Sequence, residues 1–289
     1  MDDDIFLQPE RHGNVNKIGP GEKPDHVVVG APYVHLNRQW WFALFVGAVV
    51  VITGAGFHFY CCPSLSFVRG SIQAALVTAY ILYLLRRNLR LNTGGEHQNL
   101  RAFLGPANWI TLARGALIAI LAGFLLQTWP GRSNVSEWTG WIPGAVYMTA
   151  VVGDALDGFI ARATHTQTQL GEILDTRIDA LGILVACLLA INYGQLSDYY
   201  ISAGLAYYVL RFAIWLRRKS GRPCFEIQRR PGARLMAGIQ MVFLGIVLLP
   251  LFSPQLTHIA AVVILIPFLA GFLLEWQLVC RHDKFAKID

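Results

Sequence analysis

The sequence predicts an all-α membrane protein, a bundle of helices that crosses the bilayer several times. Of the 289 residues, 54% are hydrophobic and only 15% are charged, whereas soluble domains carry about 25% charged residues. The mean hydropathy is +0.44. Apolar runs of about 20 residues recur, and each is long enough to cross the hydrocarbon core of a bilayer. Because the alternating pattern of membrane strands is absent, a helical bundle is favoured over a barrel.

Eight apolar segments are predicted as membrane spans, over residues 40–60, 66–86, 108–129, 140–163, 171–193, 199–217, 233–252 and 257–278. The first 39 residues are polar and contain four prolines. They lack the apolar region of a cleavable signal peptide. We therefore expect residues 1–39 to form a polar tail that precedes the first span.

The distribution of basic residues predicts the orientation in the membrane. An even number of spans places both termini on one side, and that side collects most of the Lys and Arg residues: Arg11, Lys17, Lys23, Arg38, Arg86, Arg87, Arg90, Arg101, Arg217, Arg218, Lys219, Arg222, Arg229, Arg230, Arg281, Lys284 and Lys287. The opposite side has little beyond Arg69 and Arg132. The positive-inside rule then predicts a multi-pass protein with both termini in the cytoplasm. The net charge of +6 is mostly a topology signal, and no nucleic-acid partner is expected because no recognition motif accompanies it.

Four aspartates interrupt this apolar pattern within the stretch GDALDGFIARATHTQTQLGEILDTRID, residues 153–179. Unpaired charge is costly at the ends of apolar spans. Asp154 and Asp157 share one face of their helix, and Asp175 and Asp179 share one face of the next. The connecting loop is short, so the two helices are expected to be antiparallel neighbours. Their acidic faces can then meet near the cytoplasmic surface.

Something positive must lie between four carboxylates that would otherwise repel one another. Arg162 and Arg177 can offset part of the charge. A hard divalent cation fits better, because all the candidate ligands are oxygens and no Cys or His joins them. The alternative is a set of helix caps and salt bridges. It is disfavoured because Asp154 and Asp157 lie near the C-terminal end of their helix, where the dipole opposes negative charge.

The glycines and the alanine of this stretch have a possible function of their own. Gly158 and Gly171 remove side chains at positions where a bulky ligand would need to approach the backbone. Ala161 adds only a small side chain to the same helix face. We therefore expect a ligand pocket beside the aspartates.

Written as a spacing, the stretch reads D-x2-D-G-x2-A-R-x8-G-x3-D-x3-D from Asp154 to Asp179. It resembles the signature of the CDP-alcohol phosphatidyltransferases, with every defined position matched. The segment GPANWITLAR resembles the opening helix of that family, a P-N-x-x-T-x-x-R pattern that helps to hold the nucleotide. Here one extra residue separates the proline from the asparagine. The resemblance implies a six-helix catalytic domain over residues 95–289, preceded by two extra transmembrane helices and a linker over residues 40–94.

The resemblance also implies an activity. Members of this family transfer a phosphatidyl or other substituted phosphoryl group from a CDP-linked lipid, such as CDP-diacylglycerol, to an alcohol. CMP is released, and the reaction serves phospholipid biosynthesis. The implied cofactors are two Mg²⁺ or Mn²⁺ ions held by Asp154, Asp157, Asp175 and Asp179, and Asp179 is also the implied catalytic base. The implied donor-binding residues are Asn108, Thr111, Arg114, Gly158, Ala161, Arg162 and Gly171. A homodimer in the membrane is expected.

The acceptor is predicted from arginines farther along the chain. Arg211 lies inside a predicted span, where a charge usually faces an interior cavity. Arg229, Arg230 and Arg234 cluster in QRRPGARLMAG, and arginine suits bidentate contact with phosphate. A phosphorylated polyol, glycerol 3-phosphate or inositol phosphate, is therefore the expected acceptor, bound by Arg211, Arg230 and Arg234. Many phosphatidylglycerophosphate synthases have Arg-Glu where this chain has Arg211-Phe212, which weakens the specific case for glycerol 3-phosphate. Simple positive-inside anchoring is the alternative for these arginines.

Two other functions are alternatives. A cation transporter or channel would explain a metal site in the membrane. It would not explain the positions of Gly158, Ala161, Arg162 and Gly171, nor the clustering of the aspartates at one membrane face. A protein that binds a CDP-lipid without turnover is disfavoured because Asp179 is intact.

Overall fold

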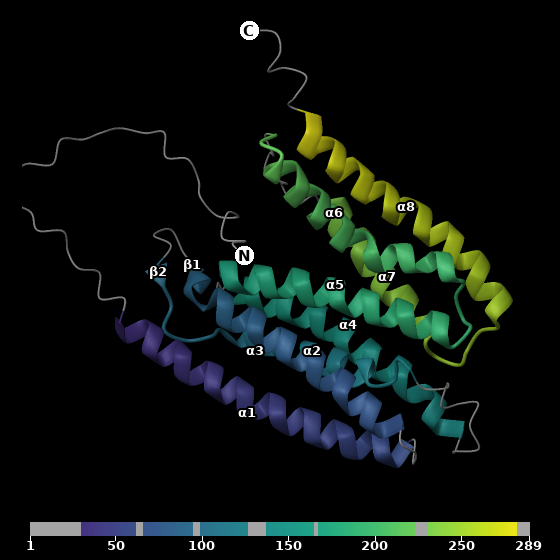
Figure 1. The fold of residues 1–289 in the computed structure, drawn as a ribbon, viewed down its shortest axis with the longest axis horizontal. Helices are drawn as coiled ribbons and strands as arrows, with labels where there is room; N and C mark the ends of the chain where they lie inside the picture. The colour runs from purple at the N-terminus through teal and green to yellow at the C-terminus, as the bar shows by residue number, and fades with distance from the viewer. Residues whose placement is uncertain are drawn as a thin grey trace, which may run out of the picture.

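A computed structural model describes residues 30–61, 66–94, 99–126, 137–164, 167–222 and 231–281. Helices dominate these residues and run alternately up and down one bundle (Figure 1). The α-helices of the described residues are α1 (Gly30–Cys61), α2 (Ser66–Asn88), α3 (Pro106–Ala122), α4 (Ile142–Ala163), α5 (Gln169–Asn192), α6 (Ile201–Lys219), α7 (Pro231–Val247) and α8 (Pro254–Arg281). The predicted all-α membrane fold is confirmed.

Short elements join some of these helices. They are the 3₁₀ turns η2 (Leu89–Leu91), η4 (Glu137–Trp141) and η5 (Asp198–Tyr200), and the two-residue strands β1 (Thr93–Gly94) and β2 (Asn99–Leu100). The strands pair antiparallel, with Thr93 opposite Leu100. This hairpin lies directly before α3 and was not predicted from the sequence, because a two-residue strand leaves no periodic pattern.

Each predicted span overlaps one of the helices, but the predicted start of the first is wrong. Helix α1 begins at Gly30, so residues 30–39 belong to the helix and not to the polar tail. Residues 1–29 lie outside the described residues. Among the described helices, four segments are long and apolar enough to cross a membrane: Pro32–Phe57, Phe67–Leu91, Thr139–Ala163 and Pro254–Cys280. Helices α3 and α7 are apolar but shorter, so eight crossings stay a prediction.

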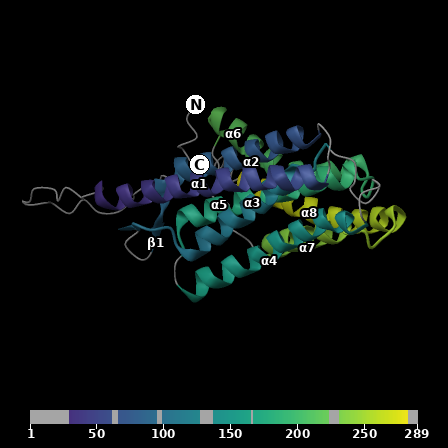
Figure 2. The same ribbon diagram turned by 90° about the horizontal axis from the view of Figure 1, so that it is seen from below.

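Helix α5 lies at the centre of the bundle. It packs against α3, α6 and α7, and about half of its residues are buried. In Figure 2, α1 and α2 lie toward one side and α4 and α7 toward the other, with α3 and α5 between them. The largest apolar core joins residues of α3, α4, α5, α7 and α8, including Ile118, Tyr147, Ile183, Leu244 and Phe268. Burial of these side chains holds the central helices in register.

The two extra N-terminal helices pack onto α3 and α5. Their shared apolar cluster consists of Leu36, Ala43, Leu84, Leu85, Leu89, Leu104, Leu170 and Leu174. The Gln39 side-chain oxygen accepts a hydrogen bond from the backbone N–H of Leu104 at 2.7 Å. This bond fixes the chain just before α3 begins. Helices α1 and α2 therefore support the two helices that carry much of the polar centre described below.

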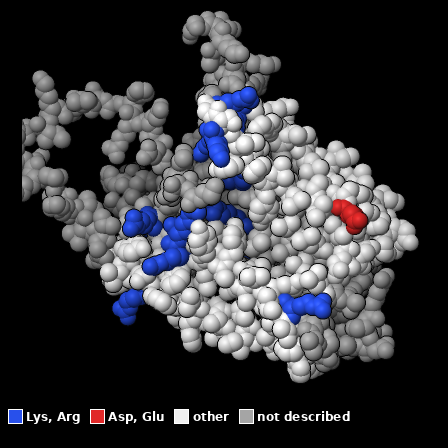
Figure 3. Space-filling view, in the orientation of Figure 1, with Lys and Arg blue, Asp and Glu red and all other residues white. Residues whose placement is uncertain are grey.

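The surface of the bundle is strongly apolar along its length. Phe45, Ile52, Val263 and Ile266 are each more than 60% exposed, which suits contact with lipid chains better than contact with water. Basic side chains gather instead at the end of the molecule where α2 and α6 end and α5 begins (Figure 3). This is the end that the charge pattern assigns to the cytoplasm.

Candidate active site

Helix α3 supplies three buried polar side chains from one face. Asn108, Thr111 and Arg114 are three residues apart along the helix, and each is 3% exposed. Side chains at this spacing lie one above another. Buried polar groups need hydrogen-bond partners, and α3 finds them on α4 and α5. It packs along both of these helices, whereas α4 and α5 contact each other much less. The acidic faces of α4 and α5 meet as expected, since carboxylate oxygens of both helices lie within 4.8 Å of one another, but most of the packing that holds the two helices together passes through α3.

Arg114 is the centre of this arrangement, because its guanidinium contacts all four aspartates. Nη1 lies 2.7 Å from Oδ2 of Asp157 and 3.0 Å from Oδ1 of Asp175. Nη2 lies 2.9 Å from Oδ1 of Asp154 and also pairs with Asp179. We call these four residues the acidic cluster. The clustering that the sequence predicted is confirmed, with an arginine of a third helix at its centre.

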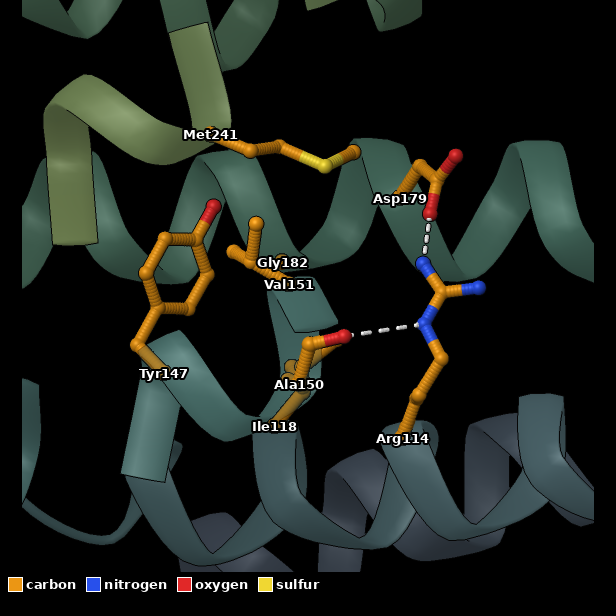
Figure 4. Close-up of a pocket in the computed structure, with 8 residues that line it drawn as sticks. All are labelled: Arg114, Ile118, Tyr147, Ala150, Val151, Asp179, Gly182 and Met241. Atoms are coloured by element: carbon orange, nitrogen blue, oxygen red, sulfur yellow. Dashed lines mark hydrogen bonds and ion pairs between the residues drawn. The ribbon is translucent and has the colours of Figure 1, made fainter. Parts of the chain in front are cut away.

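The stem of Arg114 is fixed by α4. Its Nε donates a hydrogen bond to the backbone carbonyl oxygen of Ala150 at 3.2 Å (Figure 4). A Cβ atom at Gly153 would lie only 2.8 Å from Cγ of Arg114. This is closer than packed side chains allow, so the glycine makes room for the arginine stem. The guanidinium is thereby aimed at the gap between α4 and α5.

The cluster is closed on one side and open on the other. The side chains of Arg114 and Asp157 are 4% and 6% exposed, whereas those of Asp154, Asp175 and Asp179 are 33%, 27% and 23% exposed. Arg114 and Asp157 thus form the floor of a site whose other carboxylates can be reached from outside. A ligand can approach three of the four aspartates without displacing the helices.

The geometry of three carboxylates fits a divalent cation. Asp154, Asp157 and Asp175 each offer one oxygen, and these oxygens all lie within 4.8 Å of one another. An all-oxygen donor set suits Mg²⁺ or Mn²⁺. Thr111 donates a hydrogen bond to Oδ2 of Asp157 at 2.9 Å, and Arg114 contacts the same oxygen. The other oxygen of Asp157 can therefore face a cation.

The predicted sources of counter-charge within the stretch are wrong. Arg162 is exposed, and its guanidinium lies beside Gly158, where a Cβ atom would be 3.3 Å from Nη1. Arg177 is only partly buried, and among the described residues the ion pairs of the four aspartates are made with Arg114 instead. The positive charge that offsets the aspartates comes from Arg114, which lies on α3, the helix that precedes α4 in the sequence. The spacing that marked Arg114 as a nucleotide contact did not indicate that it neutralises the aspartates.

Gly171 has a packing function in addition to any contact with a ligand. Thr168 caps α5 by accepting a hydrogen bond from the Gly171 N–H at 3.1 Å, and Asn108 donates to the Thr168 hydroxyl at 3.5 Å. A Cβ atom at Gly171 would lie 2.5 Å from Oδ1 of Asn108. Glycine therefore lets α3 and α5 approach closely here. Gly158 and Ala161 are both partly exposed on α4, and their contact with the donor stays a prediction.

The arginines predicted to bind an acceptor occupy different places. Arg234 is exposed near the start of α7 and lies close enough to interact electrostatically with Asp154. Arg211 lies on α6, with its guanidinium carbon 5.9 Å from the centroid of the Tyr207 ring. Arg230 lies outside the described residues. The structure brings one of the three, Arg234, near the acidic cluster.

Comparison with known proteins gives one match. A sequence model of the family described as CDP-alcohol phosphatidyltransferase matches residues 104–271. The matched region begins two residues before α3, ends within α8 and contains the whole acidic cluster. Helices α1 and α2 lie outside it. A search of curated proteins finds no match to this chain.

Proposed function

The chain belongs to the CDP-alcohol phosphatidyltransferase family, and on that premise we propose that it transfers a phosphatidyl group from a CDP-linked lipid to an alcohol. The observation that carries this proposal is the convergence of four aspartates, from α4 and α5, on Arg114 of α3. The convergence needs no residue outside the matched region. CDP-diacylglycerol is the proposed donor, and CMP is the proposed second product.

The acidic cluster is the proposed metal site. Asp154, Asp157 and Asp175 would hold Mg²⁺ or Mn²⁺, and Asp179 would join them if a second ion binds beside the first. When bound, the cations would offset the negative charge of the donor diphosphate and of the departing CMP. Arg114 remains the fixed positive charge on the floor of the site. It holds one oxygen of each carboxylate and so orients the other.

Asp179 is the proposed general base. An alcohol is a weak nucleophile, so its proton must be accepted as its oxygen bonds to the phosphorus that carries the lipid. In the same step the phosphorus–oxygen bond to CMP breaks, and the proton passes to the Asp179 carboxylate. The side chain is 23% exposed, so an acceptor can reach it. Its ion pair with Arg114 would keep the carboxylate oriented toward the reacting hydroxyl.

The donor is proposed to bind along the exposed edge of α4 and the start of α5. Arg162 beside Gly158 offers a free-standing guanidinium for the diphosphate. Asn108 and Thr111 are proposed to contact the donor from the buried side of the site, where Thr111 bonds to Asp157 and Asn108 lies against the start of α5. The acyl chains would remain in lipid against the apolar helix surfaces. The basic end of the bundle would face the cytoplasm by the positive-inside rule, and two copies would associate in the membrane.

The proposed acceptor is a phosphorylated polyol, such as glycerol 3-phosphate or an inositol phosphate. Arg234 supports this choice, because an exposed guanidinium within electrostatic range of Asp154 can bind an anion delivered to the edge of the cluster. Arg211 and Arg230 are proposed to complete the phosphate site. A neutral acceptor would leave these positive charges without an anion.

The test is release of CMP by the purified protein in detergent. CDP-diacylglycerol and Mg²⁺ are supplied with a panel of acceptors: glycerol 3-phosphate, inositol phosphate, serine, choline and inositol. We expect CMP release with a phosphorylated acceptor, and much slower release from the Asp157→Asn variant at the same Mg²⁺ concentration. Faster release with an unphosphorylated alcohol would overturn the acceptor proposal while leaving the transferase proposal intact. No release with any acceptor would overturn both.

A further inference from the structure

The hairpin of β1 and β2 reaches the start of α5, although it precedes the region that the family model matches. Strand β1 and the turn η2 before it both pack against α5, and Figure 1 shows β1 beside the first turn of that helix. A Cβ atom at Gly94 would lie only 2.5 Å from the backbone carbonyl oxygen of Gln167. The backbone of β1 therefore lies directly against the residue two positions before α5 begins.

Asn92 fixes the hairpin in this place. It is fully buried, and its Nδ2 donates hydrogen bonds to the backbone carbonyl oxygens of Arg101 and Phe103, each at 3.0 Å. The backbone carbonyl oxygen of Asn92 also accepts a hydrogen bond from the N–H of Arg101 at 2.9 Å. Hydrogen bonds of a buried amide are costly to lose. One side chain thus joins the chain that enters the hairpin to the chain that leaves it.

The two extra N-terminal helices hold the hairpin from the other side. In α1, the Gln39 side-chain oxygen accepts the hydrogen bond of the Leu104 N–H, which follows the hairpin. Leu89, which precedes the hairpin, is fully buried in one apolar cluster with Leu170 and Leu174 of α5. A shift of the hairpin would disturb these contacts. The contact between Gly94 and Gln167 is therefore made from a fixed support.

The contact at Gln167 continues into the proposed donor site. The next residue, Thr168, accepts hydrogen bonds at its hydroxyl oxygen from the Gly171 N–H at 3.1 Å and from the Asn108 amide at 3.5 Å. Asn108 is a proposed donor contact, and Gly171 lies in the first turn of α5, along which the donor is proposed to bind. A displacement of Gln167 would carry Thr168 with it, because the two residues share a peptide bond. It would thereby reach both groups.

We propose that the hairpin is a positioning element of the donor site and that Gly94 is the residue through which it acts. Without a side chain, Gly94 lets β1 lie close enough to set the position of Gln167 and, through Thr168, that of Gly171. The two extra helices then have a function beyond packing, since they fix the hairpin that orients the start of α5. The positioning stands on the contacts described above, whereas the CDP-linked lipid as the ligand rests on the proposed function.

The test compares Gly94→Ala with a matched control, Gly56→Ala. Gly56 lies on α1, and a Cβ atom there would contact nothing within 4 Å. In Gly94→Ala the Gln167 carbonyl must move by about 1 Å to restore an ordinary contact, and a misplacement of that size can cost about a hundredfold. We expect the KM for CDP-diacylglycerol to rise about tenfold, with kcat and the acceptor KM within about twofold of wild type. Gly56→Ala should match wild type in all three constants.

Hydrogen exchange gives a second readout that does not depend on activity. The Gly171 N–H is bonded to Thr168, so Gly94→Ala should speed amide exchange in the first turn of α5, whereas Gly56→Ala should not. Wild-type exchange in that turn, or a donor KM within about twofold of wild type, would overturn the proposal. An equal rise in both KM values would also overturn it, because the hairpin would then act on the whole bundle. Wild-type protein that releases no CMP would instead overturn the proposed function, and the exchange rates alone would then decide whether the hairpin positions α5.

Discussion

Arg114 and Asp157 form a nearly inaccessible ion pair between α3 and α4, with Nη1 and Oδ2 2.7 Å apart and side chains 4% and 6% exposed. Such a pair is costly to bury and still more costly to break on one side only. Arg114 also forms ion pairs with three further carboxylates, which are more exposed. The same contacts therefore hold the helices together and orient the groups that would bind a cation.

Removing Arg114 should destabilise the protein strongly. Arg114→Ala leaves four clustered carboxylates without their buried counter-ion, and the expected loss in the free energy of unfolding is about 3–5 kcal/mol. Mg²⁺ should recover part of that loss, because a cation can replace the missing charge. Thermal unfolding in detergent, with and without Mg²⁺, measures both effects. Arg162→Ala is the matched control, since Arg162 is exposed, and its unfolding midpoint should stay near wild type. An equal loss in both variants would contradict the central position of Arg114.

Gly171→Ala should separate α3 from α5 near the start of α5. The added Cβ would lie 2.5 Å from Oδ1 of Asn108, so Asn108 must move and its contact with Thr168 is lost. We expect weaker binding of CDP-diacylglycerol and a lower unfolding midpoint. Gly238→Ala is the control, because a Cβ there would contact nothing within 4 Å. Binding of the lipid can be followed by calorimetry. Unchanged binding and stability in Gly171→Ala would show that the close approach is not needed.

Substitution of Asp179 should impair the transfer step, whereas substitution of Asp157 should also impair binding of the metal and the donor. As the proposed base, Asp179 should be needed for the transfer step, so Asp179→Asn should lower kcat by about 10² to 10⁴ and leave binding of the CDP-lipid largely intact. Asp157→Asn should weaken Mg²⁺ and donor binding as well, because Asp157 lies in the three-carboxylate group. Rates and donor affinity measured on both variants make the comparison. Equal loss of donor binding would mean that Asp179 acts chiefly as a metal ligand.

Arg234→Ala should raise the KM for the phosphorylated acceptor and change the KM for the donor much less. The loss of one charge-assisted contact corresponds to about 1.5–3 kcal/mol, which is roughly a tenfold to hundredfold rise in the acceptor KM. Steady-state kinetics with varied acceptor concentration measures it. Arg69→Ala, in α2 near the opposite end of the bundle, is the control and should leave both constants unchanged. An unchanged acceptor KM in Arg234→Ala would remove Arg234 from the acceptor site.

The sequence predicted most of the fold because each helix carries its own apolar run, and the acidic cluster because its spacing is local. Arg114 shows the limit of prediction from local sequence patterns. It lies 40 residues before Asp154, and only the packing of α3 against both α4 and α5 brings it to the aspartates. The start of α1 was placed too late, because a few polar residues there obscured the continuation of the helix.

The central claim is that the acidic cluster binds a divalent cation in order to transfer the phosphatidyl group. The most direct measurement is CMP release from CDP-diacylglycerol by wild-type protein, with a phosphorylated acceptor, during a titration first of EDTA and then of Mg²⁺ or Mn²⁺. We predict that EDTA abolishes release, that either cation restores it, and that Asp157→Asn requires more cation than wild type. Full release of CMP in excess EDTA would contradict the account.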